Sequence, residues 1–197
     1  MEESHFKQID AIKKITTKDT VFADIGACRG DILKFLCDNC GNGYAFEPDP
    51  TNFNHLKSSF QDKNIELVNK AVSDSNGKIP FYTSTNYVGN ILGHDMDYRP
   101  FTTHIDVECV TLDDFFLDKK IDFIKMDIEG AEWRAFSGAV NLLRNKNVIF
   151  QVEFHLDEDW GKRGILYDNG YEIYTLDFQK LSHDNKRIYQ GLVAKSL

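Results

Sequence analysis

Short apolar runs typical of strands alternate with segments of helical periodicity along most of the chain, and this alternation restricts the fold more than any other feature. Five such runs predict buried strands, at residues 21–26, 44–46, 65–72, 121–128 and 147–154. Repeated strand–helix–strand units imply right-handed crossovers, which build an open and mostly parallel sheet with helices on both faces. We therefore predict an α/β fold.

Helices are predicted from apolar spacing and from capping residues. Apolar residues at helical spacing follow Gly30, and residues 49–50 supply a capping Asp and then a Pro for the first turn of another helix. A short helix is expected at 111–114, a longer one from Glu129 onward, and a further one that starts near 157–159. The apolar stripe of the longer helix comprises Trp133, Phe136, Val140 and Leu143.

Two pairs of extended segments are predicted to be antiparallel. Segments 79–82 and 105–110 are expected to pair, with a polar, aperiodic segment at 83–104 between them. Segments 171–176 and 188–194 have only a turn between them in this interpretation, so they predict a C-terminal antiparallel hairpin that finishes a seven-stranded sheet.

Length and composition bound the class of protein. The chain has 197 residues, which predicts a single domain over residues 1–197. No apolar run approaches the ~18 residues of a membrane span, and the start lacks the apolar segment of a secretory signal, so we expect a soluble, cytoplasmic protein. The net charge of −8, without a dense basic cluster, makes nucleic acid an unlikely partner. The oligomeric state stays open.

A glycine-containing loop follows the first predicted strand, where ligands of parallel sheets bind. Gly26 and Gly30 allow a tight turn before the next helix, but their G-x-x-x-G spacing differs from the G-x-G-x-x-G of dinucleotide sites. Glu47 directly follows the second predicted strand and lies about 20 residues after Gly26. In Rossmann-like sites an acidic residue at this position accepts hydrogen bonds from ribose hydroxyls. Together the two features indicate a nucleoside-containing ligand.

Four ionisable residues meet at the tips of the fourth and fifth predicted strands. Strand alternation places Lys125 and Asp127 on one face, and Glu153 and His155 likewise share a face at the neighbouring tip. Burial of such groups costs free energy unless they are paired or face a cleft. A functional site and a purely structural Lys125–Glu153 ion pair both fit this pattern.

The stretches VFADIGACRGD, YAFEPDP, NKAVSDSNGKIPFY, VTLDDF, IDFIKMDIEGAEWRAFSGA and VEFH occur in the order seen in FkbM-family methyltransferases, which the chain resembles from about Val21 to His155. The resemblance implies a Rossmann-like class I methyltransferase fold and S-adenosylmethionine (SAM) as cofactor. It also implies methylation of hydroxyl oxygens of sugars or natural products. Two features depart from the family pattern: Cys28-Arg29 replaces a small residue followed by Asn, and the region before Val21 is short.

Carried over position by position, the resemblance implies two sets of site residues. The cofactor-binding set is Asp24, Gly26, Ala27, Gly30, Glu47, Pro48, Ala71, Val72 and Asp127, with Ala71 and Val72 near the adenine. The catalytic set, which faces the methyl acceptor, is His155, Asp127, Glu153, Glu129 and Lys125.

The chemistry requires an aligned hydroxyl and a base, because the sulfonium of SAM already makes the methyl group electrophilic. His155 is the first candidate for the base, since its ordinary pKa lies closest to neutrality, and Asp127 is the second.

Two groups of side chains have the types that bind metal ions, but no bound metal is predicted. Asp127, Glu129 and Glu153 could hold Mg²⁺. Cys37 and Cys40 have CxxC spacing, yet nothing completes a zinc set, so we interpret the cysteines as reduced core residues.

The polar segment at 83–104 is a candidate lid over the acceptor. Its predicted substrate-binding residues are Asn86, Tyr87, Asn90, His94, Asp95 and Arg99.

The sequence thus predicts a SAM-dependent O-methyltransferase that acts on a hydroxyl of a sugar or glycan. The alternative acceptors are a natural product or an RNA ribose. The alternatives of another class are an NAD-dependent oxidoreductase, which the glycine spacing disfavours, and a non-catalytic nucleoside-binding module.

Overall fold

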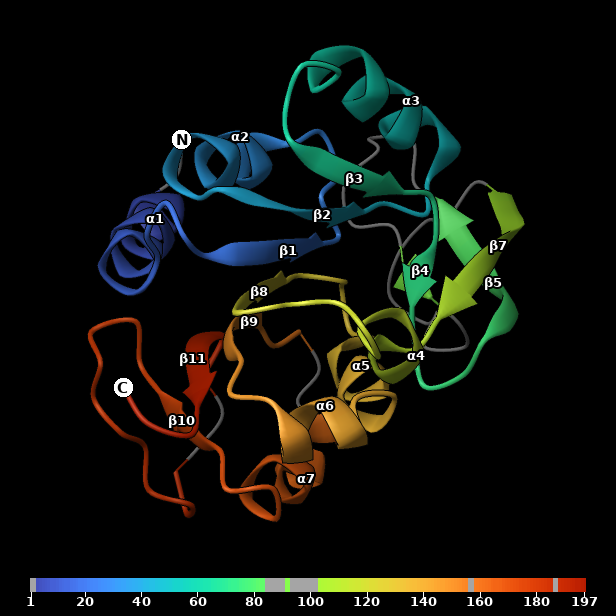
Figure 1. The fold of residues 1–197 in the computed structure, drawn as a ribbon. Coiled ribbons are helices and arrows are strands. Elements are labelled where there is room, and N and C mark those ends of the chain that lie inside the picture. Colours follow the sequence, from blue (N-terminus) through green and yellow to red (C-terminus); the bar gives the residue numbers. More distant parts are fainter. Residues whose placement is uncertain (1–2, 84–90, 93–102, 156–157, 186–187) are drawn as a thin grey trace.

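The computed structural model describes residues 3–83, 91–92, 103–155, 158–185 and 188–197. Its main sheet has seven strands in the order β10-β11-β9-β8-β1-β2-β3 (Figure 1). The strands are β1 (Val21–Ile25), β2 (Asn42–Phe46), β3 (Ile65–Val68), β8 (Phe123–Met126), β9 (Ile149–Glu153), β10 (Glu172–Tyr174) and β11 (Gln190–Ala194). Strands β3, β2, β1, β8 and β9 are parallel to their neighbours in this series, whereas β11 is antiparallel to both β9 and β10. The predicted Rossmann-like sheet and its C-terminal antiparallel pair are confirmed.

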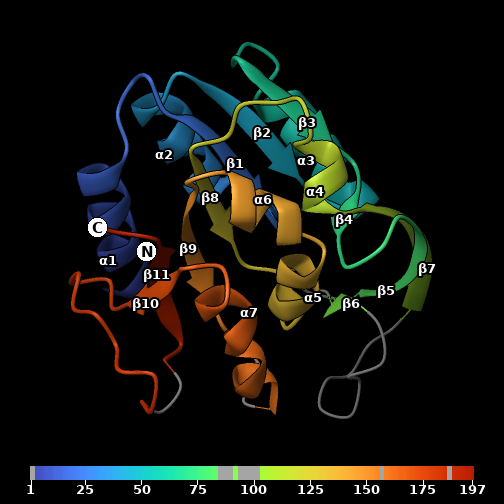
Figure 2. The same cartoon turned by 60° about the horizontal axis from the view of Figure 1, so that its bottom comes forward.

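Helices cover both faces of this sheet. Figure 2 shows α1 and α2 on one side of the strands and α5, α6 and α7 on the other. The helices are α1 (Glu3–Ile15), α2 (Asp31–Asn39), α3 (Pro50–Ser59), α4 (Leu112–Phe115), α5 (Glu132–Ser137), α6 (Val140–Asn145), α7 (Gly164–Tyr167) and the 3₁₀ helix η1 (Glu158–Arg163). None of the helices among the described residues has the length and apolar character needed to cross a membrane.

The two faces of the sheet carry separate hydrophobic clusters. Phe22 and Phe123 pack with side chains of α1, α2 and α3. Ala23 and Ile124, one position further along the same strands, pack with Trp133 and other side chains of α4 to α7. Because successive strand residues point to opposite faces, Asp24 and Lys125 lie on the face that α1 covers.

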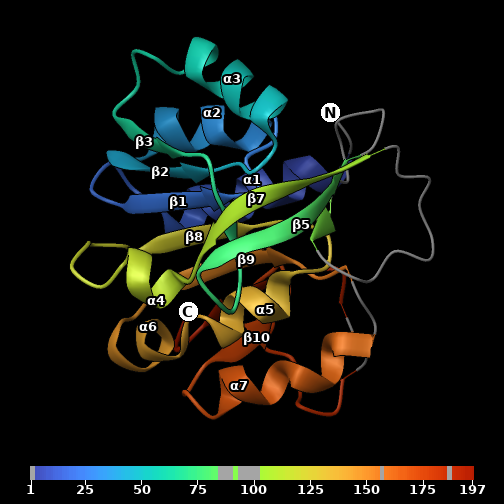
Figure 3. The same cartoon turned by 90° about the vertical axis from the view of Figure 1, so that its right-hand side faces the viewer.

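A second, four-stranded sheet lies on the side toward which β1, β2 and β3 point (Figures 1 and 3). Its order is β4-β7-β5-β6, with β4 (Ala71–Val72), β7 (Thr103–Val110), β5 (Gly77–Thr83) and β6 (Ile91–Leu92). The predicted pairing of 79–82 with 105–110 is confirmed, since Phe81 lies opposite Ile105 in an antiparallel ladder.

The single strand predicted at 65–72 is wrong, because its two ends belong to different sheets. β3 pairs with β2 in the main sheet, and β4 pairs with β7 in the second. Between them the Asn69 side-chain amide donates to the backbone carbonyl oxygens of Glu47 and Pro48, at 2.8 and 3.2 Å. These hydrogen bonds hold the chain at the point where it leaves the main sheet.

The long helix predicted from Glu129 is also wrong, because the chain forms two short helices that start later. Glu129 and Gly130 have positive φ values of 56° and 109°, which a right-handed helix does not accommodate, and α5 begins at Glu132. α5 ends before Gly138, where a Cβ would lie 2.3 Å from the Ser73 carbonyl oxygen. The predicted apolar stripe is therefore divided between α5 and α6.

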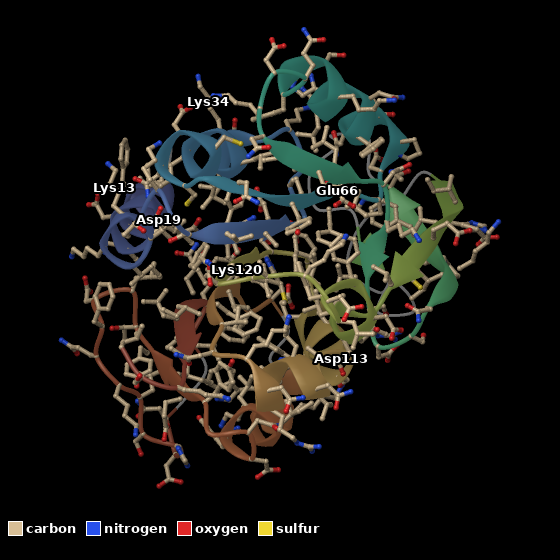
Figure 4. The ribbon with its side chains drawn as sticks, viewed as in Figure 1. Lys13, Asp19, Lys34, Glu66, Asp113 and Lys120 are labelled. Atoms are coloured by element: carbon tan, nitrogen blue, oxygen red, sulfur yellow. The ribbon has the colours of Figure 1, made fainter. Side chains whose placement is uncertain are left out.

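Helix α6 receives its cap from a neighbouring helix. Ala139, which precedes α6, has no side-chain cap, but the carboxylate of Asp113 on α4 accepts from the backbone N–H groups of Asn141 and Leu142 at 2.9 and 2.7 Å. Figure 4 shows Asp113 between the two helices. Charged side chains such as Lys13 of α1 and Lys34 of α2 lie at the periphery in the same view.

Two terminal features differ from the prediction. Helix α1 is not predicted by the sequence analysis, although Ile9, Ile12 and Ile15 have helical spacing and pack into the cluster beneath it. The connection between β10 and β11 runs from 175 to 189 and includes a bridge between Tyr174 and Lys180, so it is longer than the predicted turn.

Candidate active site

Three buried polar residues lie side by side across the centre of the main sheet. The register places Lys125 of β8 beside Asp24 of β1 and beside Gln151 of β9. Lys125 Nζ is 3.6 Å from Asp24 Oδ1. Both carboxylate oxygens of Asp24 are without a hydrogen-bond partner among the described residues, and the same is true of the Gln151 amide. Burial raises the pKa of Asp24, while the Lys125 ammonium opposes that shift.

The glycine loop after β1 is tied to both neighbouring strands. The backbone N–H groups of Gly26 and Ala27 donate to the Phe46 carbonyl oxygen of β2, at 3.1 and 3.0 Å. Gly26 has a φ of 79°, and a Cβ there would lie 2.0 Å from the Asp127 carbonyl oxygen. Gly30 has a φ of 89°, and a Cβ there would lie 2.5 Å from the Phe60 ring. Packing within the protein alone therefore requires glycine at both positions.

Glu47 joins the end of β2 to the glycine loop. Its Oε2 accepts from the Cys28 backbone N–H at 2.7 Å, and its Oε1 accepts from the Asp49 N–H at 2.8 Å. Cys28 has a positive φ of 50°, so the residue that departs from the family pattern adopts the turn that presents its N–H to Glu47. Burial raises the pKa of Glu47 to about 7. Each carboxylate oxygen keeps capacity for a further hydrogen bond.

Lys125, Asp127 and His155 form a connected chain of charged groups at the tips of β8 and β9. Lys125 Nζ is 3.6 Å from Asp127 Oδ2, and His155 Nε2 is 2.9 Å from Asp127 Oδ1. Although burial favours the neutral acid, Lys125 and His155 lower the pKa of Asp127 to about 2. Burial also works against the charge of Lys125, but Asp24 and Asp127 raise the pKa of that ammonium above its usual range.

The pKa of His155 is raised by its acidic neighbours. Burial disfavours the imidazolium, but the hydrogen bond and charge of Asp127, with the charges of Glu132 and Glu129, outweigh that effect. Glu129 Oε2 lies 3.5 Å from His155 Nδ1. Each ring nitrogen of His155 thus faces a carboxylate.

Glu153 does not form the ion pair with Lys125 that the sequence allows. The ammonium of Lys125 pairs with Asp24 and Asp127 instead, and the charge of Glu153 acts on it without a direct contact. Glu153 Oε1 accepts a hydrogen bond from the Gln8 side chain of α1. The purely structural pair is therefore wrong, and Glu153 connects β9 to the N-terminal helix.

Four side chains at this edge are absent from the sequence-based prediction: Gln8, Glu132, Gln151 and Tyr189. Glu132 Oε1 accepts from the backbone N–H groups of Ile128 and Gly130 at 3.3 and 3.1 Å, and burial raises the pKa of Glu132 to about 7. Strand alternation from Glu153 could have identified Gln151. The local sequence around Gln8 and Tyr189 offers no comparable pattern.

The remaining predicted residues lie apart from this cluster or outside the described part of the chain. Ala71 and Val72 are buried in β4 of the second sheet rather than at a tip of the main sheet. Contact of these two residues with adenine stays a prediction. The predicted acceptor residues all lie outside the described residues: Asn86, Tyr87, Asn90, His94, Asp95 and Arg99.

Among the residues that the structure describes, one group of side chains has the composition of a metal site. Ligand atoms of Asp127, Glu153 and His155 lie within 4.8 Å of one another. Asp127 already has the Lys125 ammonium and the His155 imidazole as partners, and a divalent cation would have to compete with both. The four cysteines form no disulfide, and Cys40 and Cys109 are buried.

Several solved structures similar to this chain have the names of methyltransferases. An FkbM methyltransferase from Methylobacillus flagellatus KT superimposes with a TM-score of 0.56 and 19% identity over 90% of this chain, which spans 44% of that protein. An rRNA methylase from Streptococcus thermophilus has a TM-score of 0.56 and 11% identity, with 100% of this chain and 98% of that one covered. A candidate methyltransferase from Streptococcus mutans, solved with S-adenosylhomocysteine (SAH), has a TM-score of 0.56 and 9% identity, with 98% of both chains covered.

At these low identities the superpositions show the fold alone, and the family is shown by the sequence comparison. No curated protein matches the chain by sequence. The family profile described as "Methyltransferase FkbM domain" matches residues 24–185, which include the glycine loop and the tips of β2, β8 and β9. The chain therefore belongs to the FkbM methyltransferase family.

Proposed function

We propose that this protein is a SAM-dependent O-methyltransferase that methylates a hydroxyl group of a sugar or glycan. The observation that carries the proposal is the pairing of His155 with Asp127 at 2.9 Å, at the sheet edge where the glycine loop and Glu47 also lie. The match to the FkbM family supports methyl transfer, and the SAH complex of the Streptococcus mutans protein supports SAM in this fold.

The charges of this edge fit a cationic nucleoside cofactor. The acidic residues here are Asp24, Glu47, Asp127, Glu129, Glu132 and Glu153, and they outnumber the basic Lys125 and His155. The carboxylate oxygens of Asp24, which have an ion pair with Lys125 but no hydrogen-bond partner among the described residues, are acceptors for a cationic group, and Glu47 has acceptor capacity for ribose hydroxyls. The proposed cofactor set remains Asp24, Gly26, Ala27, Gly30, Glu47, Pro48, Ala71, Val72 and Asp127.

Bound SAM would supply an electrophilic methyl group on a sulfonium, so the protein has to orient the hydroxyl and remove its proton. Asp127 is ionised because of its low pKa, and it therefore fixes the proton of neutral His155 on Nε2. Nδ1 is then the atom that accepts the hydroxyl proton. Glu129, at 3.5 Å from Nδ1, stabilises the imidazolium that results.

The proposal is tested by methyl transfer from labelled SAM to a panel of methyl glycosides, oligosaccharides, glycerol, flavonoid-type phenols and short RNA, with thermal-shift scans against SAM, SAH and NAD alongside. We expect stabilisation by SAM and SAH and label in a carbohydrate fraction. Stabilisation by NAD alone would contradict the proposal. Labelled methyl groups found only on the phenols or the RNA would show that the acceptor is not a sugar. SAM binding without methyl transfer to any acceptor would favour a non-catalytic binding module.

A further inference from the structure

A half-exposed aromatic ring stands beside the candidate base. Tyr189 is 52% exposed. Few large hydrophobic side chains among the described residues are exposed to this extent. The ring centroid of Tyr189 lies 5.3 Å from that of His155, with the two rings nearly perpendicular at 81°. Leu117, which is 71% exposed, instead lies in the connection from α4 to β8, before the first residue of that strand.

The position of Tyr189 is held by contacts on both its backbone and its side chain. Its backbone carbonyl accepts from the Phe154 N–H at 2.7 Å, just before β11 begins to pair with β9. Burial and the neighbouring Glu153 carboxylate raise the pKa of its phenol. Glu153 in turn accepts from Gln8. The ring therefore has a fixed place and still presents apolar surface to solvent.

Such a ring, flanked by carboxylates, has the composition of a carbohydrate subsite. The C–H face of a pyranose packs on a flat aromatic surface, while the hydroxyls at its edge donate to nearby acceptors. The carboxylates of Glu153 and Glu129 lie on the same side as His155 and supply those acceptors. An open-chain polyol has the hydroxyls but no comparable ring face.

We propose that Tyr189 binds the methyl acceptor by packing against the C–H face of a sugar ring, and so gives the site a preference for cyclic sugars over open-chain polyols. This inference rests on the proposed function, because it assigns the acceptor-binding role at the same site. It adds a residue outside the segment 83–104, where the sequence places the acceptor contacts.

The test compares Tyr189→Leu, Tyr189→Phe and the control Leu117→Ala, with labelled SAM and methyl glycosides of glucose, galactose, mannose and rhamnose as acceptors and glycerol as the acyclic probe. We expect Tyr189→Leu to raise KM for the preferred glycoside about five- to tenfold, since it removes one aromatic contact, with a smaller change in kcat. The KM for SAM should not change. Tyr189→Phe keeps the ring but loses the hydroxyl beside Glu153, so its glycoside KM should rise less than that of Tyr189→Leu. Leu117→Ala should stay within about twofold of the wild type.

An unchanged glycoside KM in Tyr189→Leu overturns the inference, and so do equal losses in the Leu and Phe variants, which would assign the effect to the hydroxyl. If no acceptor is methylated, the proposed function fails, but saturation-transfer NMR with the same glycosides still tests Tyr189. A saturation-transfer signal on the sugar C–H protons that is weaker in Tyr189→Leu than in the wild type supports the subsite. Absence of that signal in the wild type refutes the subsite.

Discussion

At the scale of single residues, the site depends on charged side chains whose burial would cost too much free energy if they were unpaired. Lys125 is 5% exposed and lies between the carboxylates of Asp24 and Asp127. Strand alternation predicts that Lys125 and Asp127 share a face, and Lys125 Nζ lies 3.6 Å from Asp127 Oδ2. The choice of Asp24 over Glu153 as a partner of Lys125 could not be predicted, because it depends on which strands are neighbours and on Gln8 of α1.

Replacement of Lys125 by Met should lower the free energy of unfolding by about 3 kcal/mol or more, because the buried carboxylate of Asp24 and the partly buried carboxylate of Asp127 lose their cation. The matched control is Lys120→Met, since Lys120 pairs with Asp122 at 2.9 Å but is 65% exposed. That surface pair should contribute less than about 1 kcal/mol. Urea unfolding at pH 7 measures both changes, and equal effects of the two substitutions would show that the Lys125 cluster is not as tightly buried as described.

The raised pKa of His155 predicts opposite pH dependences for activity and stability. In the proposed mechanism the neutral imidazole is the base, so transfer should increase as pH rises through the folded-state pKa, which lies above the ordinary value of 6.5. A raised pKa also means that folding favours the imidazolium. That stabilisation is fully present below pH 6.5 and is lost as pH rises through the folded pKa.

The measurement is a pair of pH profiles, one of transfer rate and one of urea midpoint, for the wild type and for His155→Gln. The rise in transfer rate should be absent from the variant. The fall in urea midpoint should be smaller but still present, because burial also raises the pKa values of Glu47 and Glu132 to about 7. A transfer profile that rises in the same way without the imidazole would assign the base to another residue.

At the scale of elements, periodicity predicts where strands and helices exist but not where close backbone contacts end them. The predicted helix from Glu129 is interrupted because Glu129 and Gly130 have positive φ and because Ser73 approaches Gly138. The first cause is a backbone conformation and the second is a tertiary contact, and neither changes the spacing of the apolar residues from which the helix is predicted. Helix α1 shows the converse: its apolar spacing is present in the sequence, but its importance appears only once Gln8 contacts Glu153.

Gly138→Ala should be destabilising by about 1–3 kcal/mol, because its new Cβ would lie 2.3 Å from the Ser73 carbonyl oxygen and the two segments would have to separate. Gly138 has an ordinary φ of −86°, so the effect isolates packing from backbone strain. The control is Gly161→Ala in η1, where a Cβ meets nothing within 4 Å. Thermal or urea unfolding that ranks Gly161→Ala as the more harmful change would refute the close approach.

At the scale of the whole molecule, the strand order gathers distant segments at one edge. β1, β8 and β9 are adjacent in the sheet although residues of the second sheet and of α2 to α6 lie between them in the sequence. The general rule that ligands bind at the carboxyl ends of parallel strands predicts this gathering. It does not predict the second sheet, which arises because the chain leaves β3 at Asn69, nor the contribution of the terminal residues Gln8 and Tyr189.

The central claim is that this edge holds SAM and that His155 takes the proton of the acceptor, and parallel measurement of SAM binding and of methyl transfer in His155→Gln tests it most directly. Calorimetry should give a Kd for SAM within about threefold of the wild type, because His155 is assigned to the acceptor side, while the transfer rate should fall by ~10²–10⁴-fold with loss of the base. Undiminished transfer in this variant, or loss of SAM binding together with transfer, would contradict the account.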